Sequence, residues 1–209
     1  MKVQDREEKS AWQERWQKGR TAWDQGRPHP SLSLLVEHAR REGGLVDGAR
    51  FYSAGAGRAH SEAALAAQGF QVDAVDLSPE AIAIAQGDYG HLTNLNLRAA
   101  DIFDIPDEER GVYDAVYDRA MLCALSPDVQ PSYVEVMTAR LKVGGLFCGI
   151  LFRSVEIASP PPYPVDEAEA MKLFAENFQL CFARAIPLSP QHPAIKEEWI
   201  CVWRRRGHA

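Results

Sequence analysis

Apolar and polar residues alternate along the chain in an order that predicts strands and helices in turn. Short apolar runs predict strands at Ala49–Ala54, Gln71–Asp76, Leu95–Ala99, Tyr113–Tyr117 and Leu146–Phe152. Segments with helical patterns are Ser31–Glu42, His60–Gln68, a helix opened by Ser78, Asp128–Leu141 and Val165–Asn177. Strands that alternate with helices in this way indicate an α/β fold with a parallel sheet and helices on both faces.

Two of these helices begin at residues that favour capping. Ser31 can cap the first helix, and Ser78, followed by Pro79, can cap the third. Gly43 and Gly44 are expected to end the first helix, because glycine accepts the left-handed conformation that follows many helices.

The end of the chain departs from the alternation. Phe178–Ala185 and Glu198–Arg204 both predict strands, and only the proline-bearing residues 187–196 lie between them. Two successive strands without a helix predict an antiparallel strand added to the parallel sheet. No repeat, low-complexity stretch or long linker divides the chain, so residues 1–209 are expected to form a single domain.

Tryptophans are concentrated near the N-terminus. Trp12, Trp16 and Trp23 are three of the five in the chain. Trp12 and Trp16 are four residues apart and would share one face of a helix. We interpret residues 1–30 as a lid segment over a ligand site; packing of the same side chains in the core is the alternative.

Composition and charge exclude several classes of protein. The chain is 46% hydrophobic and 25% charged, as expected of a globular protein. It has no apolar run of about 18 residues and its N-terminus is polar, so no membrane partner is expected and the cytoplasm is the default location. A net charge of −6 argues against nucleic acid as a partner. Four cysteines without a C-x-x-C pair argue against a disulfide framework or a metal site.

The strongest chemical signal is a glycine-bearing turn between a strand and a helix. Gly55 and Gly57 let the backbone turn sharply and approach a ligand closely. Asp76 ends the second strand about 20 residues later, where a carboxylate can accept both hydroxyl protons of a ribose. Asp101 follows the third strand and can meet an adenine amino group, and residues 117–119 follow the fourth. All these positions fall at the carboxyl ends of parallel strands, where open α/β sheets bind ligands.

Two nucleotide cofactors suit such a turn, a nicotinamide dinucleotide and S-adenosylmethionine. A dinucleotide fingerprint requires glycine three residues after Gly57, where strand and helix pack closely, and this chain has His60 there. S-adenosylmethionine has no pyrophosphate and does not require that glycine, so the sequence favours it. A strand–helix turn without a ligand, with Asp76 as a helix-capping acid, is the structural alternative.

Motifs along most of the chain resemble those of the thiopurine S-methyltransferase family. The N-terminal W-Q-x-x-W-x-x-G-x-T-x-[FW] pattern occupies Trp12–Trp23. The segments G-F-x-V-x-x-V-D-L-S-P-x-A at Gly69–Ala81, Y-D-R-x-x-L-x-A-L-x-P at Tyr117–Pro127 and P-P-[YF]-x-V at Pro161–Val165 are also present. The family's glycine loop is altered, because alanine, alanine and serine replace its proline, cysteine and acid.

The resemblance implies a Rossmann-like, seven-stranded, mostly parallel sheet with a reversed last strand. It implies that S-adenosylmethionine donates a methyl group and leaves as S-adenosylhomocysteine, and that the acceptor is a small thiol, a thiopurine or an oxyanion of selenium or tellurium. The expected cofactor-binding residues are Trp12, Trp16, Trp23, Ser53, Gly55, Gly57, Asp76, Leu77, Asp101, Ile102 and Tyr117. Asp118 and Arg119 are expected beside the reacting atoms, and no metal is expected.

Several alternatives stay open in the sequence. A related branch of the family methylates halide and thiocyanate ions, and the altered glycine loop leaves room for a protein that binds the cofactor without turnover. Arg119 can instead form a structural ion pair. Arg153 can steer an anionic acceptor or lie on the surface, and Cys123 can be packing or a reactive thiol. A soft anion needs no general base, and no Asp–His pair is evident; without a heptad seam, a monomer is expected.

Overall fold

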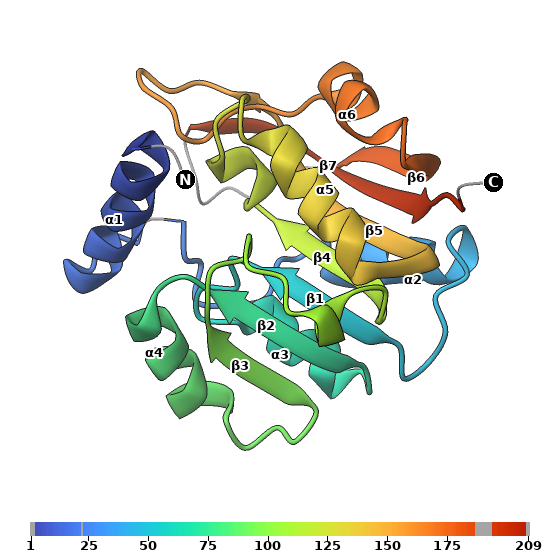
Figure 1. Cartoon of the computed structure of the whole chain (residues 1–209), viewed down its shortest axis with the longest axis horizontal. Helices are drawn as coiled ribbons and strands as arrows, with labels where there is room; N and C mark the ends of the chain where they lie inside the picture. Colours follow the sequence, from blue (N-terminus) through green and yellow to red (C-terminus); the bar gives the residue numbers. More distant parts are fainter. Residues whose placement is uncertain (1–2, 22, 187–193, 208–209) are drawn as a thin grey trace.

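The computed structural model describes residues 3–21, 23–186 and 194–207, and seven strands among them form one sheet. The strands are β1 (Arg50–Ala54), β2 (Gln71–Asp76), β3 (Leu95–Ala99), β4 (Tyr113–Arg119), β5 (Leu141–Val155), β6 (Phe178–Ile186) and β7 (Ile195–Arg205). Their order across the sheet is β3-β2-β1-β4-β5-β7-β6 (Figure 1). The pairs from β3 to β5 are parallel, whereas β7 is antiparallel to β5 and to β6. The expected parallel sheet with a reversed last strand is therefore confirmed.

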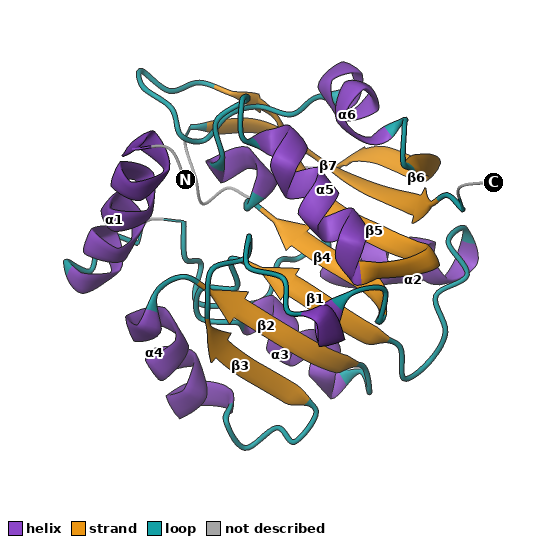
Figure 2. Ribbon diagram, viewed as in Figure 1, coloured by secondary structure: helices purple, strands orange, loops and turns teal. Residues whose placement is uncertain are grey.

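Helices cover both faces of this sheet (Figure 2). They are α1 (Val3–Gln17), α2 (Leu32–Arg41), α3 (His60–Ala67), α4 (Pro79–Tyr89), α5 (Gln130–Arg140) and α6 (Glu167–Phe174). Side chains of α2 and α3 belong to one buried cluster, and those of α5 and α6 to another. Phe51 and Tyr52, neighbours on β1, belong to different clusters, so the clusters lie on opposite faces of the sheet.

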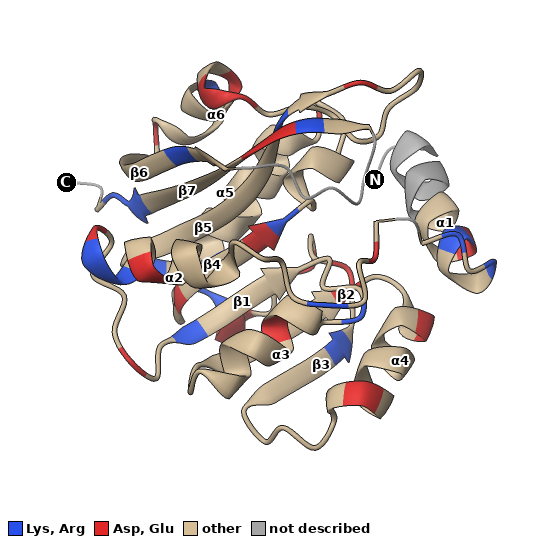
Figure 3. Ribbon diagram, turned by 180° about the vertical axis from the view of Figure 1, so that it is seen from behind, with Lys and Arg blue, Asp and Glu red and all other residues tan. Residues whose placement is uncertain are grey.

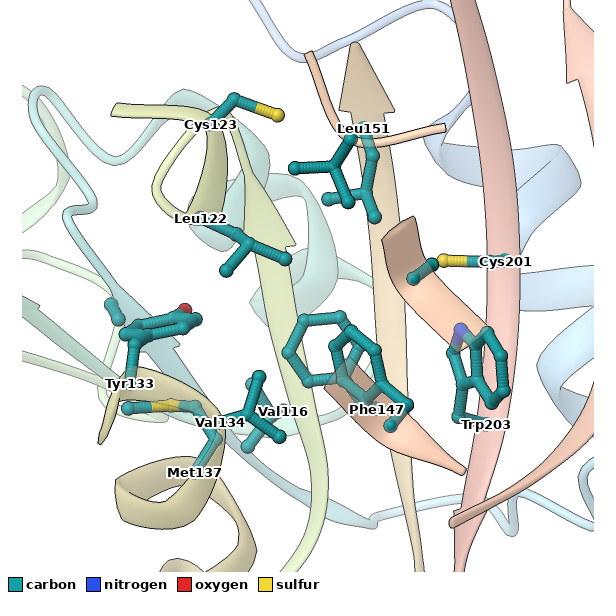
Figure 4. Close-up of a cluster of buried hydrophobic side chains, with 14 of the residues drawn as sticks. Val116, Leu122, Cys123, Tyr133, Val134, Met137, Phe147, Leu151, Cys201 and Trp203 are labelled. Atoms are coloured by element: carbon teal, nitrogen blue, oxygen red, sulfur yellow. The ribbon is translucent and has the colours of Figure 1, made fainter. Parts of the chain in front are cut away.

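The cluster on the α5 face contains the largest buried side chains. Phe147 and Trp203, from β5 and β7, lie opposite Val134 and Met137 of α5 (Figure 4). Cys123 and Cys201 are fully buried there, and burial raises the pKa of both thiols. The interpretation of the cysteines as small packing residues is confirmed for these two, and the raised pKa argues against a reactive thiol at Cys123.

Several element boundaries differ from those predicted. β5 begins at Leu141, where the sequence predicts the end of a helix, because Leu141 pairs with Tyr113 of β4. The last helix is shorter than predicted, because the Val165 N–H donates to the carbonyl of Phe152 and is held by the sheet (2.8 Å). Asp166 caps that helix instead, and its carboxylate accepts the Glu169 N–H (2.9 Å). Two short 3₁₀ turns, Asp107–Glu109 and Leu122–Ala124, were not predicted at all.

The two expected caps have different outcomes. The Ser78 hydroxyl accepts the Ala81 N–H (3.2 Å), so this cap is confirmed. Ser31 precedes α2, but its hydroxyl makes no capping hydrogen bond, so that prediction is wrong. The Ser31 N–H instead donates to Nδ1 of His29 (3.1 Å), and its ψ of 6° lies away from the extended conformation that a capping side chain needs.

The surface carries charges of both signs, as the ribbon coloured by charge shows (Figure 3). In the described ranges, no helix has the length and apolar character needed to cross a membrane. No cluster of three or more His, Cys, Asp or Glu side chains suited to a metal ion occurs within the same ranges.

Candidate functional site

A cavity of about 850 Å³ opens at the carboxyl ends of the parallel strands, and α1 lies beyond these ends (Figure 1). Most of the site residues predicted from sequence line it. They are Trp12, Trp16, Trp23, Gly55, Gly57, Asp76, Leu77, Asp101, Ile102, Tyr117 and Arg119. Ser53 and Asp118 do not line it.

The glycine turn between β1 and α3 is held close to its neighbours. Gly55 and Gly57 have φ angles of 65° and 55°, which favour glycine. A Cβ atom on Gly55 would lie 2.5 Å from the sulfur of Met121, and one on Gly57 would lie 3.3 Å from the ring of Trp16. The positive φ angles therefore favour glycine at both positions, and a Cβ at Gly55 would also require the Met121 side chain to move. Flanking residues of the loop depart from the family pattern.

Asp76 anchors this turn from the end of β2. Its carboxylate accepts the Gly57 N–H and the Ser78 N–H, both at 2.8 Å. Burial raises the pKa of Asp76, whereas the two backbone hydrogen bonds oppose that shift. Asp76 thus joins the glycine turn to the N-terminus of α4 and also faces the cavity.

Aromatic side chains from two segments meet at one side of the cavity. The ring of Trp23 lies 5.2 Å from that of Trp12 and 5.9 Å from that of Trp16, both edge to face. Gln13 of α1 also donates to the carbonyl of Leu77 (3.4 Å). Three aromatic faces are thus held together beside the glycine turn.

A charged contact fastens the segment after Trp23 to the glycine turn. The Asp24 carboxylate lies 3.3 Å from Nε2 of His60 and 3.5 Å from the Arg58 guanidinium. It also accepts the Gly26 N–H at 2.9 Å. An Asp–His pair therefore exists, although the sequence did not reveal it, because Asp24 and His60 meet only when the N-terminal segment folds back over the turn.

A second polar group in the cavity wall is centred on Arg119. Its guanidinium lies 3.9 Å from Oε1 of Glu198 and 3.5 Å from the Trp23 carbonyl, and its Nε is buried without a partner. Oε2 of Glu198 lies 3.2 Å from Nε2 of His29, whose Nδ1 accepts the Ser31 N–H. The acceptor at Nδ1 implies that Nε2 carries the proton and donates it to Glu198.

His29 and Glu198 were missed in the sequence because they are 169 residues apart. The available signal was an acid at the start of an otherwise apolar strand. The Arg119 guanidinium carbon lies 5.9 Å from the centre of the Phe152 ring. Other apolar side chains that line the cavity are Ile157, Pro161, Pro162 and Ile195. Arg153 pairs with Glu167 (2.9 Å) and Glu197 (3.0 Å) and does not line the cavity.

The two predicted residues that do not line the cavity each form a hydrogen bond with a residue that does. Asp118 is fully buried, and its carboxylate accepts the Tyr133 hydroxyl (2.7 Å) and the backbone N–H groups of Met121 and Leu122. Burial raises the pKa of Asp118 to about 6, although these hydrogen bonds oppose the shift. The hydroxyl of Ser53 donates to Glu62 (2.6 Å).

The bonding of Asp118 leads to a test of its role. We expect Asp118→Asn to lower the free energy of unfolding by about 1–3 kcal/mol, because an amide cannot accept from all three donors. Urea denaturation at pH 7 measures this, with Asp47→Asn on the exposed loop after α2 as the control. Unchanged stability with lost turnover would contradict a positioning role and favour direct contact with the reacting groups.

Comparison with known proteins places the chain among methyltransferases. The model of a family described as thiopurine S-methyltransferase matches residues 7–198. Probable thiol methyltransferase 2 of Arabidopsis thaliana is 28% identical over 199 residues, which cover 94% of this chain and 80% of the relative. Thiocyanate methyltransferase 1 of the same plant is 28% identical over 162 residues, which cover 76% of this chain and 68% of the relative.

A solved structure shares the fold. It is the 1,6-didemethyltoxoflavin-N1-methyltransferase of Burkholderia thailandensis with bound 1,6-didemethyltoxoflavin and S-adenosylhomocysteine. It aligns with a TM-score of 0.73 and 22% identity, covering 95% of this chain and 87% of that chain. At this identity, the likeness concerns the architecture of the sheet and its helices.

Proposed function

This chain belongs to the thiopurine S-methyltransferase family of S-adenosylmethionine-dependent methyltransferases, and we propose that it methylates a small thiol, a thiopurine or an oxyanion of selenium or tellurium. The observation that carries the proposal is the composition of the cavity. One part of its lining, which we call the first end, consists of the glycine turn and Asp76, and another part, the second end, consists of Arg119 and apolar side chains such as Phe152. Residues suited to a nucleotide and a cationic side chain suited to an anion thus line one cavity.

The residues at the first end fit S-adenosylmethionine. Gly55 and Gly57 line the cavity and carry no side chain, so the backbone of the turn can approach a ligand closely. We assign Asp76 to the ribose hydroxyls and Asp101, with Leu77 and Ile102, to the adenosine end. Trp12, Trp16 and Trp23 would close the cavity over the cofactor as a lid formed by residues 1–30. Ser53 would act indirectly, through its hydrogen bond to Glu62.

The residues at the second end fit a soft, anionic acceptor. When bound, S-adenosylmethionine supplies an electrophilic methyl carbon on a sulfonium cation. Apolar side chains such as Phe152 and Pro161 would exclude water once the cavity is closed, which would strengthen the attraction of an anion to the Arg119 guanidinium. Both ring nitrogens of His29 are engaged in hydrogen bonds, so this histidine is not free to act as a base. An acceptor that is already ionised needs no base.

Labelled methyl transfer tests the proposal directly. The chain would be incubated with isotope-labelled S-adenosylmethionine and thiophenol, a thiopurine, sulfide, selenite, tellurite, thiocyanate or iodide. Methylated sulfur, selenium or tellurium products would support the proposal. Binding of S-adenosylhomocysteine without any product would favour a protein that binds the cofactor without turnover, and absence of binding would overturn the proposal.

A second candidate activity is methylation of thiocyanate or halide ions. The likeness to a plant thiocyanate methyltransferase favours it, and so does a cationic side chain in an apolar end of the cavity. Methyl thiocyanate or methyl iodide as the main products of the panel would select this activity. The cytoplasmic location and the monomeric state stay predictions from the sequence.

Arg119 offers a specific test of anion binding. We expect Arg119→Gln to raise KM for ionised acceptors by about 10- to 100-fold, because a hydrogen bond to a charged group contributes about 1.5–3 kcal/mol. Steady-state kinetics measure this, and the Kd of S-adenosylhomocysteine should change little. Arg153→Gln is the matched control, since Arg153 pairs with surface acids. Equal effects of the two substitutions would contradict the assignment.

A further inference from the structure

Glu62 is a buried acid in the cavity wall that no sequence motif singled out. It lies in the first turn of α3, directly behind the glycine turn, and is only 4% exposed. One carboxylate oxygen accepts the Ser53 hydroxyl at 2.6 Å. Among the described residues, no Lys, Arg or His nitrogen lies within 4 Å of this carboxylate. The side chain therefore faces a ligand cavity without a cationic partner.

The groups around Glu62 do not supply the missing charge. Ser53 approaches from β1, Asp76 from β2, and Tyr117 and Arg119 from β4. Burial raises the pKa of Glu62 to about 7, and the negative charge of Asp76 adds to the shift. The Ser53 hydroxyl, the backbone N–H of Glu62 and the more distant Arg119 lower it. The free protein thus holds Glu62 at the balance between its neutral and charged forms near pH 7.

A buried carboxyl of this kind gains most from a ligand that brings a cation with hydrogen-bond donors. The ammonium of an amino acid has both properties, whereas a sulfonium has no proton to donate. Glu62 lines the cavity from the first turn of α3, which directly follows the glycine turn that we assign to the cofactor.

We propose, on the premise of the proposed function, that Glu62 binds the ammonium group of the amino-acid end of S-adenosylmethionine and releases its own proton to solvent when the cofactor binds. The ligand's positive charge favours the carboxylate, so the proton leaves the carboxyl and no covalent bond in the cofactor changes. Cofactor affinity therefore depends on the protonation state of Glu62.

The sign of the pH dependence follows from the form that binds. The ammonium prefers ionised Glu62, and the ionised fraction of the free protein rises with pH. With a free pKa of about 7, affinity should increase about tenfold between pH 6 and pH 8 and level off above. At pH 7, where half of the Glu62 side chains are protonated, about half a proton should be released for each ligand bound.

Calorimetry with two ligands isolates this contribution. S-adenosylhomocysteine carries the amino-acid end, whereas 5′-methylthioadenosine lacks it, and neither carries a sulfonium. Titrations at pH 7 in phosphate and in imidazole, whose ionisation enthalpies differ, should reveal proton release for S-adenosylhomocysteine alone. A deaminated analogue that keeps the carboxylate should also bind without proton release, which separates the ammonium from the rest of the amino-acid end.

A Glu62→Gln variant provides the second arm. Its amide oxygen can still accept the Ser53 hydroxyl, so the hydrogen bond is kept and the charge is removed. We expect about 10- to 100-fold weaker binding of S-adenosylhomocysteine, no proton release and unchanged binding of 5′-methylthioadenosine, because a charge-assisted hydrogen bond is lost. The control is Glu37→Gln on the exposed face of α2.

The outcomes separate this inference from the proposed function. If the unaltered protein binds neither nucleoside, the proposed function is wrong. If it binds S-adenosylhomocysteine with the same heat in both buffers and an affinity independent of pH, the inference about Glu62 is wrong while the function stands. The titrations of the unaltered protein decide this even if the Glu62→Gln variant fails to fold.

Discussion

Asp76→Asn is expected to weaken the binding of S-adenosylhomocysteine by at least about 100-fold. We assign two ribose hydroxyls of the ligand to the charged Asp76 carboxylate, and a hydrogen bond to a charged group contributes about 1.5–3 kcal/mol. In the structure, the Asp76 carboxylate accepts from the backbone N–H groups of both Gly57 and Ser78. Asparagine has only one acceptor oxygen. Its NH₂ group would therefore lie against the N–H of Gly57 or of Ser78, and two donors cannot form a hydrogen bond with each other. The substitution therefore loosens the glycine turn and removes the charged acceptor that we assign to the ribose.

Isothermal titration calorimetry measures this loss, and Asp73→Asn is the matched control. Asp73 lies on the same strand three residues earlier, and its carboxylate binds Arg50 and Asn96 outside the cavity. The control should lower stability without a comparable change in Kd. If both variants lost affinity equally, the effect would come from a damaged strand, and the assignment of Asp76 to the cofactor would be wrong.

The second large effect concerns the N-terminal segment. Removal of residues 1–25 is expected to lower kcat/KM by about 10³-fold. Each aromatic face near the sulfonium of S-adenosylmethionine contributes roughly 0.5–2 kcal/mol, and without the segment water enters the opened cavity. The truncation removes Trp12, Trp16 and Trp23 from the wall of the cavity. It also removes Asp24, which holds this segment against Arg58 and His60.

Thermal unfolding of the truncated chain and the milder Asp24→Asn variant serve as controls for this prediction. None of the described side chains of the removed segment belongs to either buried cluster, so thermal unfolding should stay cooperative. Asp24→Asn in the full chain should weaken cofactor binding in the same direction and to a smaller extent, because the three tryptophans remain. Methyl-transfer assays with undiminished kcat/KM after truncation would contradict the proposed lid.

Much of the fold and part of the site were predictable from local patterns. The boundaries of β2 and β3 agree with the predictions, because apolar runs bounded by glycine and polar residues depend on few distant contacts. The glycine turn and Asp76 were identified for a related reason. Backbone conformation at Gly55 and Gly57 is a local requirement, and Asp76 occupies a position defined by the end of a strand.

Tertiary structure alone decided which polar groups meet. Folding brings His29 next to Glu198 and Asp24 next to His60. No sequence motif links the segments that carry these residues. The direction in which a side chain points was also hidden: Asp118 faces inward to Tyr133, whereas its neighbour Arg119 reaches the cavity. Alternate residues of a strand point to opposite sides, so adjacent members of one motif have different surroundings. The sequence by itself determined the family, the order of the elements and the glycine turn, because these depend on local patterns. The partners of the buried charges depend on distances across the folded chain, and only packing sets those distances.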